Sequence, residues 1–285
     1  MTLTTKALLV SLKISQWSAR KLDRKETAEL ALKHGTAVDV ARVNKSLLPM
    51  SLTLEAIHKK TTAMRRDYYC NSLPWGQEGV SVIKTDGYME FTRLMSGHIH
   101  EWRGLVDDFI LDYPNLQAAA RRLLNGMYRD EDYPAPESLR RKFAAEVRFF
   151  PIPEQGDWRV VLNDEEMEEL RKQTRDDIAQ SQSIAMRDAW KRVHEVVEHA
   201  VGRLGDEKAV FRDSLIDNAR EMCRVMSVLN VVDDPNLEAI RSEIERTLCK
   251  HTAEGLRSAP DVRADVADKM RAIMDKMGAF YGPAA

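Results

Sequence analysis

Apolar positions in the first quarter of the chain predict one extended segment and two helices. Residues 7–14 (ALLVSLKI) are rich in aliphatic side chains and fit either a strand or the lead-in to a helix. From residue 15 to 33 the pattern is helical, and Gly35 is suited to the left-handed cap that ends a helix. A second helix should follow Ser51, because a mostly apolar stripe recurs there at steps of three or four. The stripe consists of Leu54, Ile57, Thr61, Met64 and Tyr68.

The middle of the chain predicts further helices and one hairpin. Asp86 can cap a helix that runs to about Tyr113. Pro114 is expected to end that helix, because proline lacks an N–H and its ring clashes with the preceding turn. Another helix should follow it, and Pro136 is suited to the first turn of a later one. Residues 147–162 (VRFFPIPEQGDWRVVL) hold two β-rich runs around a Pro/Gly turn, which predicts a hairpin.

Beyond residue 163 the pattern is almost entirely helical. Residues 163–205 fit one long helix with acidic residues at its start, where they favour the helix dipole. Between 171 and 183 the only large apolar residue is Ile178, so this part should project into solvent or meet a partner. A heptad-like rhythm then predicts coiled-coil-like pairing, either back onto the long helix or with a second copy of the chain. Its members are Phe211, Leu215, Asn218, Met222, Met226 and Leu229.

These elements together predict a mainly α-helical fold with a small β-hairpin element. Residues 1–162 should form a mixed, mostly helical globular domain with a basic N-terminus. Residues 163–285 should form an elongated antiparallel helical bundle or long helical hairpin with coiled-coil-like packing. Two more helices, opened by Pro235 and Pro260, complete this second part.

Composition narrows the class of protein. The chain has 285 residues, of which 44% are hydrophobic and 31% are charged, so it can bury a core and keep a polar surface. No apolar run approaches the roughly 20 residues that cross a bilayer, and none resembles a signal sequence, so we expect a cytoplasmic protein without a membrane partner. The three cysteines are far apart and form no CxxC motif, which fits reduced thiols.

The net charge of −2 hides an uneven distribution. Residues 1–75 carry 13 Lys and Arg against 6 Asp and Glu, whereas the rest of the chain carries 30 against 39. This asymmetry predicts an acidic partner for the N-terminal part. Attraction between the two parts of the same molecule is the alternative.

A tryptophan with four nearby cations is the strongest candidate binding site. If residues 15–33 form a helix, the four cations lie within roughly 80° of Trp17 around its axis. They are Arg20, Lys21, Arg24 and Lys25. Such cations can hold phosphates while the indole stacks on a base, which predicts binding of single-stranded nucleic acid or another acidic partner. In the alternative, Trp17 is a core residue and the long side chains reach outward, because Ala28, Ala31 and Leu32 share its face.

Further basic pairs on the predicted second helix can extend this surface. They are Lys59 with Lys60, and Arg65 with Arg66. Each pair taken alone is an ordinary solvated position.

No catalytic or metal-binding pattern is present in the sequence. His194 and His199 are five residues apart, which places them roughly 140° from each other on a helix instead of on one face. His98 and His100 lie in a helical pattern, where residues two apart point in different directions. There is no phosphate-binding glycine loop and no nucleophile elbow. We therefore predict no catalytic residue, no metal and no cofactor, and an enzyme ranks third among the function classes.

Several stretches within residues 8–162 together resemble a family of phage and integrative-element proteins that is defined only as a domain of unknown function. They are ISQWSARKLDRKETAE, ARVNKSLLP, NSLPWGQEGVSVI, DYPNL, DEDYPAPESLRRKF and FPIPEQGDWRV. The family offers no catalytic residues to carry over. The resemblance implies a bacterial host cytoplasm, and genes found near the family imply a partnership with a MoxR/CobS-like AAA+ ATPase and a von Willebrand A-type protein.

Two function classes follow. In the first, the chain is a non-enzymatic phage or mobile-element accessory protein that acts through protein–protein contacts and self-associates through its helical part. In the second, it is a single-strand nucleic-acid-binding protein of a phage recombination module that uses the basic Trp17 segment. The first needs a self-complementary apolar seam, whereas the second needs a continuous basic surface.

Overall fold

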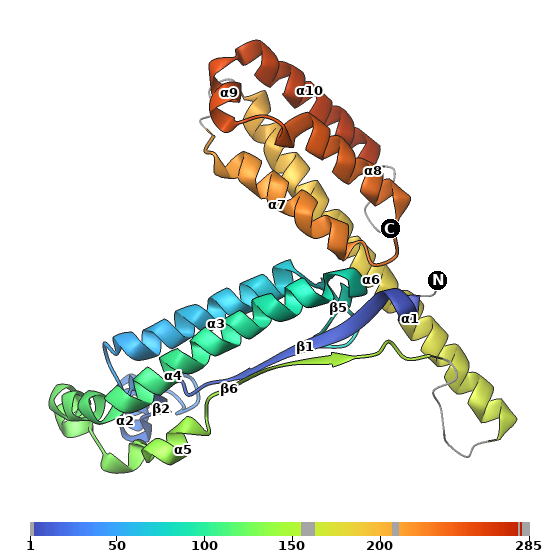
Figure 1. Ribbon diagram of the computed structural model, residues 1–285. Helices are drawn as coiled ribbons and strands as arrows, with labels where there is room; N and C mark the ends of the chain where they lie inside the picture. The colour runs from blue at the N-terminus through green and yellow to red at the C-terminus, as the bar shows by residue number, and fades with distance from the viewer. Residues whose placement is uncertain (1–2, 155–162, 207–210, 279, 281–285) are drawn as a thin grey trace. The chain divides into compact units, whose positions relative to one another are not determined.

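The computed structural model describes residues 3–154, 163–206, 211–278 and 280 of the chain (Figure 1). Helices dominate it, and the strands form a small four-stranded sheet and a separate two-stranded ribbon. The expectation of a mainly α-helical protein with a small amount of antiparallel sheet is therefore confirmed.

The chain divides into two compact units, and each is assembled from separate segments. Unit 1 comprises Met1–Ser11, Asp67–Thr92 and Arg148–Ala285, and unit 2 comprises Leu12–Arg66 and Arg93–Val147. The predicted boundary at residue 163 divides the chain in sequence order and stays a prediction. The two compact units are not successive stretches of sequence, because the chain leaves unit 1 twice and returns to it twice.

The four-stranded sheet has the order β4-β5-β1-β6. Its strands are β4 (Leu73–Pro74), β5 (Val80–Lys84), β1 (Ala7–Ser15) and β6 (Ala144–Phe150). β1 runs antiparallel to β5, with Ala7 opposite Lys84 and Leu9 opposite Val82. Residues 7–14 are thus a strand, after the short helix α1 (Leu3–Lys6). β6 contains the first run of the predicted hairpin, whereas residues 155–162 lie outside the described residues.

The predicted helix over residues 15–33 is wrong in its first half and right in its second half. Residues Arg20–Leu22 form strand β2, which pairs antiparallel with β3 (Asn44–Ser46), and helix α2 covers only Arg24–His34. Asp23 separates the two elements because its carboxylate accepts the Glu26 N–H at 3.3 Å and caps α2. The predicted end of the helix is confirmed, since Gly35 has a φ of 63°.

Helix α3 (Leu52–Cys70) agrees with the sequence analysis. The Ser51 hydroxyl accepts the Leu54 N–H at 3.2 Å, so Ser51 is the predicted cap. All five residues of the predicted stripe are buried. Tyr68, the last of them, donates its hydroxyl hydrogen to the Val10 carbonyl at 2.8 Å and so ties α3 to β1 within unit 1.

Pro114 does not end the next helix, contrary to the prediction. Helix α4 runs from Tyr88 to Leu124 with Pro114 inside it, and Asp86 lies in a 3₁₀ turn just before its start. An interior proline removes one hydrogen bond and costs about 3 kcal/mol. Burial on both sides of the proline offsets that cost, because Phe109, Tyr113 and Ala120 are each at most 1% exposed.

Two short elements connect α4 to β6. The chain makes 3₁₀ turns at Asn125–Met127 and Asp130–Asp132 and then forms α5 (Pro136–Arg140). Pro136 occupies the first turn of α5, as predicted. The helix is a little over one turn long because the following residues join the sheet as β6.

The remaining residues form the helical part of unit 1. Asn163 caps the long helix in a reciprocal arrangement, in which its side chain accepts the Glu166 N–H at 2.8 Å and Glu166 accepts the Asn163 N–H. The predicted single long helix is confirmed. The helices are α6 (Asp164–Gly205), α7 (Ser214–Leu229), α8 (Pro235–Ile244), a π-helical turn (Glu245–Cys249), α9 (Ala253–Ser258) and α10 (Pro260–Met277). α6 packs along α10 and α7, and Val193, Val197 and Leu204 of α6 are buried in the shared core.

Candidate functional site

Trp17 lies between β1 and β2, within the aromatic core of unit 2. Its side chain is half-buried, and its ring centroid lies 6.5 Å from that of Phe109 and 6.0 Å from that of Tyr113. The Tyr113 ring meets it edge-on, at an interplanar angle of 78°. Both partners belong to α4 and are buried. The indole is therefore packed against other rings instead of standing free on a helix beside the four cations.

The four predicted cations lie on two different elements. Arg20 and Lys21 belong to β2, whereas Arg24 and Lys25 open α2. All four are exposed, but only Arg20 and Arg24 form no ion pair among the residues that the structure describes. Lys25 faces Glu29 at 3.7 Å, one turn along the helix.

Lys21 takes part in a charged cluster that holds the two-stranded ribbon to the rest of unit 2. Lys21 and Lys45 are directly opposite each other across β2 and β3, where two like charges repel. Asp132 compensates for this repulsion, since its two oxygens lie 2.5 Å from Lys21 Nζ and 2.7 Å from Lys45 Nζ. Lys45 also lies 3.7 Å from the Asp23 carboxylate and donates to the Met127 carbonyl at 2.9 Å.

Burial makes this cluster sensitive to the loss of Lys45 or Asp132. The side chains of Lys45 and Asp132 are 5% and 2% exposed, whereas that of Lys21 is 50% exposed. Burial acts to raise the pKa of Asp132, but hydrogen bonds from Lys21 and Lys45 outweigh it and hold the pKa below its ordinary value. Asp132 is therefore ionised at neutral pH and balances one of the two lysine charges, while Asp23 lies near the second lysine partner, Lys45.

Sequence reasoning missed Lys45 and Asp132. They are distant in sequence, and each is a common residue type in a polar context, so no local signal marks them as partners. Their pairing follows from the position of the Asp130–Asp132 turn against β3, which only the tertiary structure supplies.

The additional basic residues of α3 do not form one open patch. Lys59 pairs with Glu55 at 2.7 Å, and Lys60 forms an ion pair with Glu101 of α4. Arg65 and Arg66 are exposed. Two of the four predicted residues are thus engaged with carboxylates of the same unit.

Positive charge nevertheless concentrates in unit 2. This unit contains 20 Lys and Arg against 14 Asp and Glu, whereas unit 1 contains 23 against 31. The asymmetry found along the sequence therefore becomes an asymmetry between compact units. A unit with such an excess of positive charge attracts negatively charged groups.

One short part of unit 2 combines unpaired cations with exposed aliphatic side chains. The loop after α2 returns to the start of that helix, because the Asp23 N–H donates to the Val43 carbonyl at 2.9 Å and the Val43 N–H donates to Thr27 Oγ1 at 3.1 Å. Four cations of this part form no ion pair with any described residue, and four aliphatic residues are between 37% and 87% exposed. We call these eight residues the basic–apolar surface: Arg20, Leu22, Arg24, Leu32, Lys33, Val38, Val40 and Arg42.

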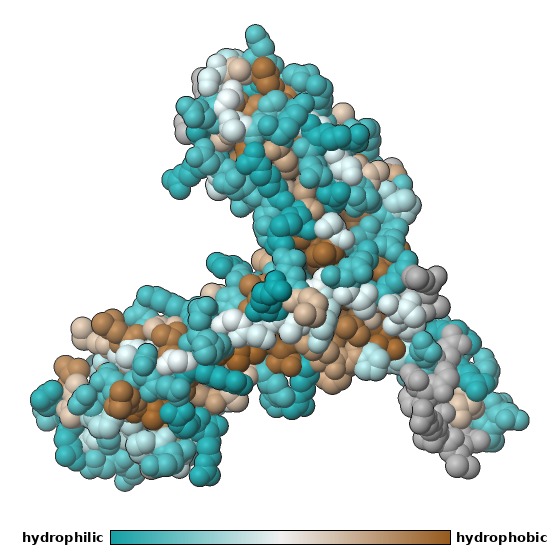
Figure 2. Space-filling view, viewed as in Figure 1, coloured by the Kyte–Doolittle hydropathy of each residue, from teal (hydrophilic) through white to brown (hydrophobic). Residues whose placement is uncertain are grey.

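Figure 2 shows apolar residues exposed among hydrophilic ones along α3 and α4 of unit 2. Aromatic side chains behave differently there. In the described part of unit 2 every Trp, Tyr and Phe side chain is buried or half-buried. The surface therefore offers charge and aliphatic area but no open ring on which a base could stack.

The predicted helix-pairing residues lie inside unit 1. Phe211, Leu215, Met222, Met226 and Leu229 are all at most 9% exposed and belong to its continuous core. Asn218, the polar position of the rhythm, is exposed. α7 packs on α6 of the same chain, which is the intramolecular arrangement that the sequence left open.

The histidines do not gather with other metal-binding groups. His194 Nδ1 lies 3.9 Å from Glu198, its neighbour one turn along α6. Within residues 3–154, 163–206 and 211–278, no three His, Cys, Asp or Glu side chains are placed to hold a metal ion.

None of the described helices combines the length and the apolar character that a membrane span requires. Comparisons of the chain with protein-family models, with curated proteins and with solved structures find no match.

Proposed function

We propose that this chain is a non-enzymatic accessory protein of a phage or mobile element, and that it binds an acidic protein partner through the basic–apolar surface. The observation that carries the proposal is the coincidence of four unpaired cations with four exposed aliphatic side chains between residues 20 and 42. Cations without intramolecular partners are free to pair with carboxylates, and exposed aliphatic area gains free energy when a partner covers it.

The packing of Trp17 favours a protein partner over single-stranded nucleic acid. Proteins that bind single strands combine basic grooves with rings on which bases stack. The Trp17 ring is held by Phe109 and Tyr113, and unit 2 has no strongly exposed ring among its described residues. Leu32 and Val40, which are 87% and 71% exposed, instead match the apolar side chains of a protein surface.

The AAA+ ATPase and the von Willebrand A-type protein implied by the family resemblance are the partners that we propose to test first. Nucleic acid is the second candidate because of the excess of Lys and Arg in unit 2. Binding of nucleic acid relies on phosphate contacts, so its affinity falls steeply as the salt concentration rises.

We expect two sets of substitutions to weaken binding of the ATPase for different reasons. The triple variant Arg20→Gln, Arg24→Gln and Arg42→Gln removes charge, and the double variant Leu32→Ser and Val40→Ser removes exposed aliphatic area. Each should weaken binding at least about tenfold, since each removes several contacts worth about 1 kcal/mol or less apiece. The measurement is calorimetric titration of the purified AAA+ ATPase at physiological salt.

A matched control removes the same number of positive charges from another part of unit 2. Arg122, Arg141 and Lys142 are exposed residues of unit 2 and form no ion pair with any described residue. If their replacement by Gln weakens the ATPase complex as much as the first triple variant does, the basic–apolar surface is not the docking site. Tight binding of oligo(dT) that is lost in the first triple variant and retained in the aliphatic variant would establish the nucleic-acid alternative.

Self-association through residues 164–230 stays a prediction. The apolar positions from Phe211 to Leu229 are covered within one chain, so self-association through this segment has to use side chains that are exposed in the single chain, such as those on α6. Residues 164–173 of that helix have no buried side chain. Light scattering at high concentration that returns twice the chain mass of 32.6 kDa supports self-association, and a mass of 32.6 kDa shows that intramolecular packing satisfies the seam.

A further inference from the structure

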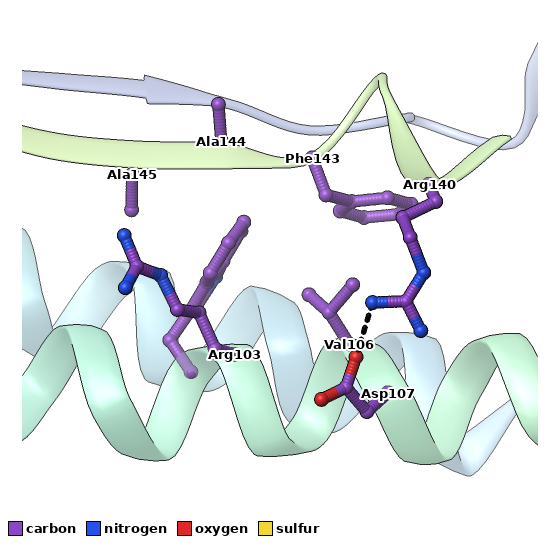
Figure 3. A pocket seen from close by; sticks show the side chains of 8 residues that line it. Arg103, Val106, Asp107, Arg140, Phe143, Ala144 and Ala145 are labelled. Atoms are coloured by element: carbon purple, nitrogen blue, oxygen red, sulfur yellow. Dashed lines mark hydrogen bonds and ion pairs between the residues drawn. The ribbon is translucent and has the colours of Figure 1, made fainter. Parts of the chain in front are cut away.

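The pocket in unit 2 between α4 and the segment that joins α5 to β6 contains an ion pair and is lined by no thiol, hydroxyl or imidazole group (Figure 3). Arg140 enters it from the end of α5 and pairs with Asp107 of α4. Reactive side chains meet in the helical part of unit 1 instead, where Cys223 and Cys249 form a pair of thiols. Neither cysteine belongs to the basic–apolar surface, so the pair is a separate site.

Two elements bring these thiols together. Cys223 belongs to α7, and Cys249 ends the π-helical turn that packs against α7. The two thiols share a hydrogen bond, and Cys223 Sγ also lies 3.7 Å from the Arg241 carbonyl oxygen. Short π-helical stretches occur frequently at functional sites. No CxxC spacing marks this pair in the sequence, because it forms only when α7 and the turn pack together.

Arg220 fixes the backbone of the turn beside Cys223. Its Nε and Nη2 donate to the Cys249 carbonyl at 3.0 and 2.9 Å, and Nη2 also donates to the His251 carbonyl at 2.9 Å. Arg220 lies one turn before Cys223 on α7, so the two side chains share a face of that helix. These hydrogen bonds hold Cys249 against the face of α7 that carries Cys223.

The surroundings give the two thiols different chemical roles. Cys249 is half-buried, whereas Cys223 is 3% exposed. The hydrogen bond from Cys223 and the positive charge of Arg220 hold the pKa of the Cys249 thiol below its ordinary value, against the effects of burial and of Glu245. The hydrogen bond to Cys249 and burial raise the pKa of Cys223. Cys249 is thus the thiol that ionises and reacts, and Cys223 stays protonated beside it.

We propose that Cys223 and Cys249 form an oxidative modification site, at which a hydroperoxide closes an intramolecular disulfide. The Cys249 thiolate attacks one peroxide oxygen and becomes a sulfenic acid, while the O–O bond breaks and the second oxygen leaves as hydroxide or alkoxide. The Cys223 sulfur then attacks the Cys249 sulfur, the S–O bond breaks, and the Cys223 proton leaves with the hydroxyl group as water. The two thiols lose two electrons and the peroxide gains them. A reducing dithiol restores the pair by thiol–disulfide exchange.

The proposal is tested by treating the full chain with hydrogen peroxide, alkylating the remaining thiols and measuring the masses of its peptides. We expect a Cys223–Cys249 disulfide, with a mass lower by about 2 Da for the two hydrogens lost, that dithiothreitol reverses. Cys70 is exposed at the end of α3 and outside the pair, so it is the internal reference. The pair should be oxidised about tenfold faster than Cys70, because thiolate character governs the rate more than exposure does. Oxidation of the pair no faster than that of Cys70, or a disulfide that includes Cys70, would overturn the proposal.

Two substitutions separate the roles of the thiols. Cys223→Ser removes the sulfur that attacks second, so Cys249 should accumulate as a sulfenic acid that dimedone traps. Cys249→Ser should give no dimedone adduct at Cys223. Circular dichroism checks that each variant is folded, and the wild-type measurement decides the proposal if one is not. An adduct at Cys223 in Cys249→Ser with none at Cys249 in Cys223→Ser would overturn the assigned roles.

Arg220→Gln tests whether Arg220 positions and activates Cys249. It should slow disulfide formation several-fold and move the pH at which the oxidation rate is half-maximal upward, because the Cys249 thiolate loses a nearby positive charge. A loss of packing alone would slow the reaction without moving that pH. Arg246→Gln is the matched control, because Arg246 is an exposed residue of the same turn and donates to the Ser242 carbonyl instead. An unchanged pH profile in Arg220→Gln, or an equal shift in Arg246→Gln, would overturn the role given to Arg220.

Discussion

Replacing Asp132 by Asn should lower the free energy of unfolding by about 3 kcal/mol, because it leaves the buried Lys45 charge without its closest counter-ion. The asparagine keeps the shape of the side chain, so the loss reports the charge. The remaining carboxylate near Lys45 is Asp23, whose Oδ2 lies 3.7 Å from Lys45 Nζ and compensates only in part. Urea denaturation followed by circular dichroism measures the change.

The contribution of Asp132 should also depend on pH in a defined direction. The pKa of Asp132 lies below its ordinary value in the folded chain, so folding favours the ionised form. Its stabilising effect is complete above the unfolded-state pKa of about 3.9 and is lost as the pH falls through the folded-state pKa. The difference in stability between the wild type and Asp132→Asn should therefore shrink as the pH is lowered below about 4.

Asp130→Asn is the matched control for this prediction. Asp130 pairs with Arg121 at 2.7 Å, but both side chains are more than 60% exposed, so the substitution should cost less than about 1 kcal/mol. Adding Lys45→Met to Asp132→Asn should recover much of the lost stability, since no unpaired buried lysine remains. Equal effects of the Asp130 and Asp132 substitutions would contradict the view that burial gives the cluster its importance.

Replacing Trp17 by Ala should destabilise unit 2 by about 3 kcal/mol, because truncating a packed tryptophan leaves a cavity beside Phe109 and Tyr113. Binding of the acidic partner, measured at a temperature where the variant is folded, should stay unchanged. This result would show that the Trp17 indole contributes to the stability of unit 2 and that the cations contribute to partner binding. Thermal melting and calorimetric titration of the same variant give both readouts.

Tyr113→Phe keeps the ring that Trp17 packs against and removes only its hydroxyl. That hydroxyl is buried without a hydrogen-bond partner among the described atoms, so its loss should be neutral or slightly stabilising. An unchanged melting temperature in Trp17→Ala together with lost binding would refute the core assignment and return Trp17 to the binding surface.

Local signals in the sequence predict the caps and faces of helices well. Ser51 caps α3 and Gly35 ends α2 with a positive φ, as predicted, whereas Asp86 lies in a 3₁₀ turn before α4 and is not its cap. The two confirmed features depend on hydrogen bonds within a few residues, so the sequence contains all of the information that they require. The same holds for the buried stripe of α3, because periodicity alone identifies the face that packs.

The secondary-structure predictions fail where contacts with residues far along the chain determine the local conformation. Residues 20–22 have a helical pattern, yet they pair with residues 44–46, and this pairing gives their backbone a partner that the local pattern does not reveal. Pro114 has a strong local preference to end a helix, but buried side chains on both sides of it hold α4 together. At both places tertiary contacts stabilise the observed conformation by more free energy than the local sequence preference for another conformation provides.

The candidate surface shows the same division between local and distant information. The sequence by itself determined that the N-terminal part carries an excess of positive charge and that Trp17 lies near four cations, because both are properties of composition and order. Only the tertiary structure decided which cations are free, since Asp132 lies far along the chain from Lys21 and Lys45 and reaches them only after folding. Likewise it placed the Trp17 ring against α4 and left Arg20 and Arg24 unpaired. Ion pairing and burial depend on distances in space, and these distances are set when segments far apart in the sequence pack together.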